Sequence, residues 1–293
     1  MLQPRVGVAL ALVQVFFGIH YFAAKIILQM MPPRAWASVR IVGAATLLLV
    51  YNLLFVRRAP RSFGDVARLA VFALFGVVLN QILFVEGLSR TTPAHSSIIN
   101  SLIPVMTMGI ALLAGQERAT VARGIALGVS FASILLLLGV ENFRVENELV
   151  VGDLLTLANG LSFSIFLVIS HGFLKRTDPL AATSHLLVLG AIGILIAGAE
   201  PLSKVDFGTL PPQFWWLAAY AIVFATVLAY FLNYYALRHT DSSMVALFIY
   251  MQPPIATALS MIFLGERPGP RFWIAAAGVF VGVFLSVRDR ARG

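Results

Sequence analysis

The chain alternates between long apolar runs and short polar breaks. A membrane-spanning helix needs about 20 mostly apolar residues, and ten runs reach this length. The breaks hold prolines, glycines and charges, which are typical turn signals, and none is long enough for a soluble domain. The predicted helices cover residues 6–30, 35–56, 67–88, 93–115, 120–140, 151–172, 180–199, 213–236, 242–264 and 270–287.

The fourth and ninth runs share one layout. Each has a proline near its middle and a Glu-Arg pair at its end, and the second copy lies 149 residues after the first. Pro104 matches Pro253, and Glu117 matches Glu266. An internal repeat of this kind indicates that the whole fold consists of two similar halves.

The first helices of the two halves also correspond, with Gln14 matching Asn159 at a slightly different spacing. Each half holds five predicted helices, so the second half must enter the membrane from the opposite side. Inverted repeats are a common architecture of secondary transporters. The sequence therefore predicts an all-α integral membrane protein of ten transmembrane helices, built as two inverted five-helix repeats over 6–140 and 151–287.

Composition supports lipid as the solvent. The chain is 59% hydrophobic and 12% charged, whereas soluble domains carry about 25% charged residues. The net charge of +8 comes from short Lys and Arg clusters between the apolar runs, which argues against a nucleic-acid partner. Cysteine is absent, which excludes a disulfide framework, a thiolate metal site and a cysteine nucleophile.

Charge also predicts the orientation. The two ends and the even-numbered connections hold 13 Lys and Arg residues, against 6 in the odd-numbered connections. Cytoplasmic loops carry the excess of positive charge, so we expect a multi-pass protein of the cell (inner) membrane with both termini in the cytoplasm. The tryptophans fall at predicted outer ends, at headgroup level: Trp36, Trp215, Trp216 and Trp273.

The chain resembles the EamA-type transporters of the drug/metabolite transporter superfamily. The features that carry the resemblance are the five-plus-five layout, Phe17-Gly18 followed by Lys25, Arg40 in the second helix, and the Gly265-Glu266 ending. The resemblance covers nearly the whole chain. It implies a secondary transporter that exports small metabolites by alternating access at a midplane site between the repeats. It leaves a monomer and a homodimer open.

Polar residues are costly inside membrane helices and are candidates for a substrate pathway. In the fourth helix, Asn100 and Ser101 lie on one face with Pro104; in the ninth, Tyr250 lies with Pro253. Each proline frees the carbonyl four residues earlier, so we predict two hinges that line a cavity. The alternative is a pair of kinks used only for helix packing.

Other helices add amide and aromatic side chains with few fixed charges. Such a lining suits a small amphipathic organic solute, and we expect amino acids, above all apolar or aromatic ones. A strongly anionic solute would need more buried cations. The predicted substrate-binding residues are Gln14, Tyr21, Asn80, Phe84, Asn100, Ser101, Asn159, Phe166, Tyr230, Asn233 and Tyr250.

Three residues are candidates for proton coupling: Glu86, His20 and His95. Histidine titrates near neutral pH, although a lone histidine in a helix is often a hydrogen-bonded packing residue. Lys25 and Arg40 lie toward predicted outer ends. They are read equally well as side chains that snorkel to the interface.

Two G-x-x-x-G patterns, Gly124–Gly128 and Gly278–Gly282, predict either an internal helix seam, which we prefer, or a dimer face.

Other functional classes find less support. The sequence has no phosphate-binding G-x-x-x-x-G-K-[ST] loop and none of the H-E-x-x-H or G-x-S-x-G enzyme motifs. We therefore expect no enzyme, cofactor or metal site. A passive channel or facilitator for small amphipathic solutes remains the alternative to a carrier, and a structural or partner-binding membrane protein is a further one.

Overall fold

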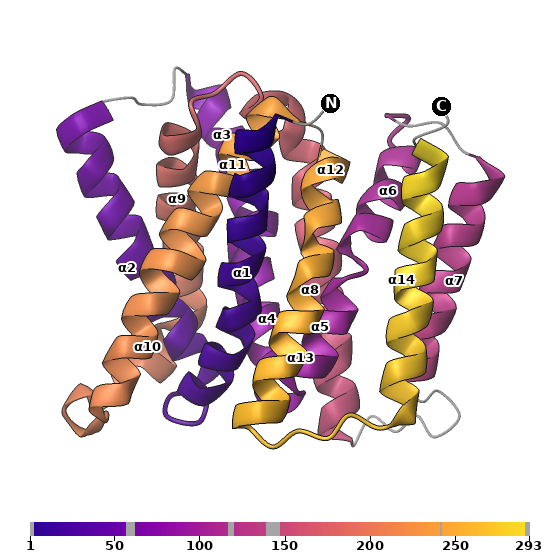
Figure 1. The fold of residues 1–293 in the computed structure, drawn as a ribbon. Helices are drawn as coiled ribbons and strands as arrows, with labels where there is room; N and C mark the ends of the chain where they lie inside the picture. The colour runs from indigo at the N-terminus through magenta and orange to yellow at the C-terminus, as the bar shows by residue number, and fades with distance from the viewer. Residues whose placement is uncertain (1–2, 57–61, 117–119, 139–146, 241, 291–293) are drawn as a thin grey trace.

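The structure is a computed structural model that describes residues 3–56, 62–116, 120–138, 147–240 and 242–290. All regular elements in these ranges are helices, and they run side by side as a row of rods with the two ends of the chain on the same side (Figure 1). The Glu117-Arg118 pair of the sequence repeat lies outside the described residues.

The first half contains seven α-helices and two π-helical segments among its described residues. They are α1 (Pro4–Ile27), α2 (Pro33–Tyr51), η1 (Asn52–Val56), α3 (Phe63–Ala73), η2 (Leu74–Leu79), α4 (Asn80–Arg90), α5 (Pro93–Asn100), α6 (Ile103–Leu113) and α7 (Val121–Leu138).

The second half follows the same order. Its elements are α8 (Glu148–Leu174), α9 (Pro179–Ser203), the 3-10 turn η4 (Phe207–Thr209), α10 (Pro212–Ile222), the π-helical η5 (Val223–Leu228), α11 (Ala229–His239), α12 (Ser242–Leu247), the 3-10 turn η6 (Phe248–Met251), α13 (Gln252–Phe263) and α14 (Pro270–Arg290).

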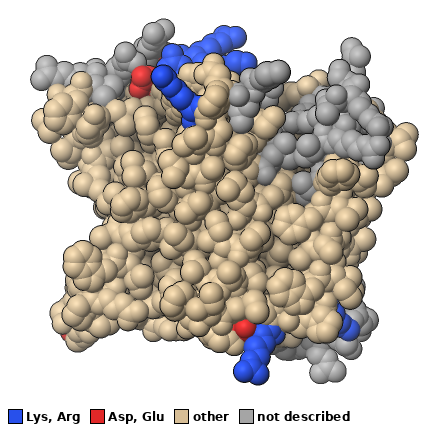
Figure 2. All heavy atoms as spheres, in the orientation of Figure 1, with Lys and Arg blue, Asp and Glu red and all other residues tan. Residues whose placement is uncertain are grey.

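Eight helical stretches of the described chain are long and apolar enough to cross a membrane, and two shorter apolar helices cover Gly124–Leu138 and Pro270–Gly282. In the space-filling view, Lys, Arg, Asp and Glu gather at the two ends, and the band between them shows no charged side chain (Figure 2). An uncharged band of this kind is what the hydrocarbon core of a bilayer requires.

The polar breaks of the sequence start helices for a local reason. Pro33, Pro93 and Pro179 each occupy the first turn of a helix, where the missing N–H costs no hydrogen bond. The side chain of Thr92 accepts from His95 N at 3.2 Å, and Asp178 accepts from the start of α9. Such N-caps satisfy donors that no helix turn can reach.

The two mid-helix prolines mark complete breaks. α5 ends at Asn100, and Pro104 is the second residue of α6. In the second half, a 3-10 turn separates α12 from α13, and Pro253 is the second residue of α13. Because proline is tolerated in the first turn of a helix, each proline begins a new half-helix.

The third and eighth predicted helices are longer than expected, and each contains a π-helical segment. The bounds of α3, η2 and α4 recur in α10, η5 and α11 at a spacing of 149 residues. These segments contain no proline and no pair of glycines, so the apolar pattern could not predict the π-helical turns. π-turns inside α-helices are frequent at functional sites.

Glycine contacts place one of the two G-x-x-x-G patterns in an internal seam. A Cβ at Gly278 or Gly282 would run into the side chains of Ser133 and Ser130 on α7, against which α14 packs. A Cβ at Gly128, by contrast, would meet no atom within 4 Å.

We expect Gly282→Val to lower the Tm of the detergent-purified protein by roughly 3–10 °C, because an overpacked contact costs about 1–3 kcal/mol. Gly128→Val is the matched control and should leave the Tm nearly unchanged. Equal Tm values for the two variants would contradict the seam.

Candidate functional site

A cavity of about 80 Å³ lies among helices of both halves. α1, α2, α4 and the α5–α6 break contribute from the first half, and α8, α11 and the α12–α13 break from the second. The lining residues are Gln14, Phe17, His20, Tyr21, Arg40, Asn80, Gln81, Phe84, Asn100, Ile103, Asn159, Phe163, Tyr230, Asn233, Tyr234, Val245, Ile249 and Gln252.

The structure brings most of the predicted binding residues together here. Eight line the cavity: Gln14, Tyr21, Asn80, Phe84, Asn100, Asn159, Tyr230 and Asn233. The candidate proton-coupling residue His20 also lines it. That these side chains bind substrate stays a prediction.

Three predicted binding residues lie outside the cavity lining. Ser101 donates to carbonyls of its own helix, Ser97 O at 3.1 Å and Ile98 O at 2.8 Å. Phe166 is fully buried against Gly76. The ring of Tyr250 packs near Phe280 instead, at 6.1 Å between centroids.

Arg40 does not snorkel to the interface. Its side chain is 1% exposed and lines the cavity. Nε donates to Thr226 Oγ1 at 2.7 Å, Nη1 to Gln81 Oε1 at 2.9 Å, and Nη2 to the carbonyl of Ala225 at 2.9 Å. Position along its own helix suggested an outer end, but the π-helical segment of the other half covers it.

Hydrogen bonds between the two halves surround the cavity. Gln81 Nε2 donates to Tyr230 Oη at 3.1 Å, and these two residues are themselves 149 positions apart. Gln252 Nε2 donates to Gln14 Oε1 at 2.5 Å, and Asn159 Nδ2 donates to the carbonyl of Asn80 at 2.7 Å. The amides therefore join the halves as well as line the cavity.

Two carbonyls in the π-helical segments also accept hydrogen bonds from the opposite half. A π-turn interrupts the regular i→i+4 ladder, and a carbonyl left without its helical partner must be satisfied by another group inside lipid. Gly76 O in η2 accepts from Tyr230 Oη at 3.3 Å, and Ala225 O in η5 accepts from Arg40. Gly76 and Ala225 are again 149 residues apart.

Several polar atoms on the cavity wall have no hydrogen-bond partner among the described residues. They are both ring nitrogens of His20, Oδ1 of Asn100, Oδ1 of Asn233 and Oη of Tyr234. A buried polar group without a partner costs about 1–3 kcal/mol, so a solute with matching donors and acceptors would relieve this cost.

Gln252 is a functional candidate that the sequence did not predict, and Arg40 was left open between a functional role and snorkelling. Gln252 directly precedes Pro253 in the broken ninth helix. A polar amide beside a mid-helix proline was therefore an available signal for a cavity residue. Among the described residues, no group of three or more His, Cys, Asp or Glu could hold a metal ion.

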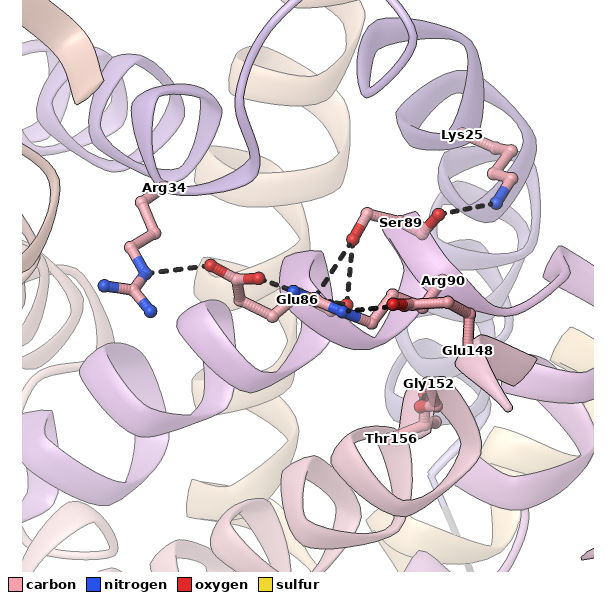
Figure 3. A network of polar contacts seen from close by, with 8 residues as sticks. All are labelled: Lys25, Arg34, Glu86, Ser89, Arg90, Glu148, Gly152 and Thr156. Atoms are coloured by element: carbon pink, nitrogen blue, oxygen red, sulfur yellow. Dashed lines mark hydrogen bonds and ion pairs between the residues drawn. The ribbon is translucent and has the colours of Figure 1, made fainter. Parts of the chain in front are cut away.

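The end of the molecule opposite the termini is tied together by polar contacts (Figure 3). Lys25 Nζ donates to three carbonyls near the end of α4: Leu88 O at 2.9 Å, Ser89 O at 3.2 Å and Thr91 O at 2.6 Å. A cation at a helix C-terminus also suits the helix dipole. Lys25 therefore holds α1 to α4 and does not snorkel freely.

Glu86 lies in the same network, between Arg34 at 2.8 Å and Arg90 at 2.6 Å. Arg90 also reaches Glu148 at 3.3 Å, which connects α4 to the start of α8 (Figure 3). This proton-coupling candidate is therefore an ion-paired residue in this conformation.

Asp153 lies inside α8 and is buried. It accepts from Thr91 Oγ1, and its other oxygen lies 3.0 Å from His95 Nδ1. Gly152 permits this contact, because a Cβ there would lie 2.6 Å from Thr91 N. The candidate His95 is thus paired with an acid at the α4–α8 crossing.

The opposite end holds a larger cleft. A cleft of about 1,060 Å³ lies where α3 begins, α8 ends, α9 begins and α11 ends, on the side of the chain termini in Figure 1. Its charged walls include Arg68, Arg176 and Arg238, together with Asp65. One end of the molecule is therefore tied by ion pairs and the other holds a wide polar cleft.

A model of the EamA-like transporter family matches the chain twice, over residues 5–139 and again over 150–288. The chain belongs to the EamA-like transporter family. This EamA protein is a multi-pass membrane protein with all-helical architecture, and the family is one of membrane transporters that carry small molecules.

Similar proteins agree. An uncharacterized transporter of Archaeoglobus fulgidus is 26% identical, covering 97% of this chain and 98% of its own. The uncharacterized inner membrane transporter YedA of Escherichia coli is 24% identical, covering 97% and 90%. A crystal structure with 17% identity matches with a TM-score of 0.67 over 98% of this chain and 96% of its own, which supports the fold alone.

We expect Lys25→Met to lower the Tm, because three carbonyls at the end of α4 lose their charged donor. One hydrogen bond to a charged group is worth about 1.5–3 kcal/mol, so the shift should be roughly 5 °C or more. Lys175→Met, at an exposed lysine on the other end, is the control. No difference between the two variants would contradict the role of Lys25.

Proposed function

We propose that this EamA protein is a secondary transporter that exports small amphipathic metabolites, amino acids among them, by alternating access at the cavity. The observation that carries the proposal is the cavity itself. It lies between the two family matches, is lined by both, and holds polar atoms without protein partners.

The repeat architecture belongs to the same proposal. We infer ten spans, with the two shorter apolar helices as the fifth and tenth, arranged as inverted repeats over 6–140 and 151–287. The double family match and the recurrence of helix bounds at a spacing of 149 residues support this arrangement. Rocking of two such repeats about a midplane site is a known transport geometry.

The unlike ends of the molecule fit one stage of such a cycle. Ion pairs and the Lys25 contacts join helices at the end opposite the termini, whereas the end with the termini holds the larger cleft. With both termini in the cytoplasm, this conformation would face inward. The breaks at Pro104 and Pro253 are the proposed hinges of the motion.

Orientation is testable because the chain has no cysteine. Lys175 and Lys204 are exposed and lie at opposite ends of the molecule. In whole cells, a membrane-impermeant thiol reagent should label Lys204→Cys and leave Lys175→Cys unlabelled until the cells are opened. The reverse pattern would place the termini outside.

Transport itself is tested by uptake of labelled amino acids into proteoliposomes, with and without unlabelled solute preloaded inside. A carrier should show trans-stimulation by its own substrate. Flux without trans-stimulation would favour the passive channel or facilitator, and no flux of any solute would contradict transport.

The cavity predicts which variants lose uptake. Gln14→Ala and Asn159→Ala should each lower the uptake rate by about tenfold, because an unpaired polar group costs about 1–3 kcal/mol. Gln213→Ala, at an exposed position at the start of α10, should retain the wild-type rate. Equal rates in all three variants would place the substrate elsewhere.

Proton coupling remains part of the proposal, with His20, His95 and Glu86 as its candidates. The three lie in different surroundings: on the cavity wall, beside Asp153, and between two arginines. An imposed pH gradient should change the uptake rate. A rate indifferent to the gradient would exclude proton coupling and leave the carrier intact.

A further inference from the structure

Arg40 is a buried cation on the cavity wall. It is 1% exposed, and no other residue lining the cavity in the described part of the chain is a Lys, Arg, Asp or Glu. All three of its hydrogen-bond acceptors are neutral: a hydroxyl, an amide oxygen and a backbone carbonyl. The described residues therefore give its charge no acidic partner.

An unpaired charge in this position is expensive. Moving an ion out of water costs several kcal/mol even after the protein relaxes, and a buried cation normally pairs with an acid or lines a pathway. Glu86, at one end of the molecule, has such partners in Arg34 and Arg90. Arg40 is the exception on the cavity wall.

Arg40 also keeps binding capacity. A guanidinium has five N–H donors in a planar fork that matches a carboxylate. Three bonds are made within the protein, which leaves donors on Nη1 and Nη2. The hydrogen bonds to Gln81 and Thr226 also fix the orientation of the guanidinium, so Arg40 is oriented before a solute enters.

We propose that the transported solute carries a carboxylate and that Arg40 binds it. The inference rests on the proposed transport function and names the substrate class of that site. It narrows the sequence expectation of a site with few fixed charges to a site with one, because one unpaired cation in a low-dielectric cavity is enough to select one carboxylate over a neutral or cationic group.

The size of the cavity limits the rest of the solute. An engineered cavity of about 150 Å³ binds benzene, and this one is about 80 Å³. In this conformation it has room for a small solute only. An aromatic amino acid would require further opening of the walls.

The competing explanation is structural. Arg40 ties α2 to α4 and η5, and it could do only that. If Arg40 only joined helices, the protein would bind an acid and its amide equally well. If Arg40 binds a carboxylate, the protein must bind the acid more tightly than the amide. The test is therefore built on the ligand first and on variants second.

The first measurement uses the wild-type protein in detergent and compares each acid with its amide, which lacks the carboxylate: acetate to 3-phenylpropionate against their amides, and alanine against alaninamide. At least one acid should bind about 10- to 100-fold more tightly than its amide. If no acid outcompetes its amide, the proposal is overturned. The arms with and without an α-amino group distinguish an amino acid from a simple acid.

The second measurement uses variants. Arg40→Gln should remove the preference for the acid, and Arg40→Lys should retain part of it, because the charge stays while the fork is lost. Gln81→Glu supplies an internal acid where Gln81 Oε1 lies 2.9 Å from Nη1, so it should also abolish the preference. Lys175→Gln removes a surface cation and should change nothing.

Gln81→Glu keeps the test decisive if Arg40→Gln fails to fold. A folded Gln81→Glu protein with the wild-type preference for acids would overturn the proposal. Counterflow in proteoliposomes separates this result from a failure of transport. If acids bind in an Arg40-dependent way but no flux is seen, the carboxylate site is supported and the transport function is contradicted. If trans-stimulated flux is seen but does not depend on a carboxylate, the transport function is supported and the carboxylate site is contradicted.

Discussion

Inside a bilayer, every backbone N–H and C=O must find a partner within the protein. In this EamA protein, two π-helical segments, η2 and η5, lie beside the cavity. A carbonyl in each segment accepts a hydrogen bond from the opposite half of the chain. Tyr230 of the second half bonds Gly76 O, and Arg40 of the first half bonds Ala225 O. The contact between the halves and the polar site are therefore one construction.

Much of the fold could be predicted from local sequence signals. Apolar run length, prolines at helix starts and the two mid-helix prolines act over a few residues, and the structure places helix ends or breaks at these points. The positions of the amides Gln14, Asn100 and Asn159 followed from helical spacing, because residues on one helix face share an environment.

The remaining features depend on partners far away in the chain. The acceptors that bury Arg40 include Ala225 and Thr226, more than 180 positions later. The position of Arg40 in the sequence of α2 indicates only that it lies about 10 Å along the helix axis from Pro33, at 1.5 Å per residue. The buried role of Asp153 likewise depends on Thr91 and His95 across a helix crossing. Pattern along one helix carries no information about such contacts.

The unpaired guanidinium of Arg40 has an electrical consequence. The empty cavity carries a positive charge, whereas a cavity filled by a monocarboxylate would be neutral at this point. A membrane potential acts on charge, at about 2.3 kcal/mol per elementary charge per 100 mV. An inside-negative potential would then bias the return of the empty carrier toward the cytoplasmic side and leave the step that carries such a solute almost indifferent to voltage.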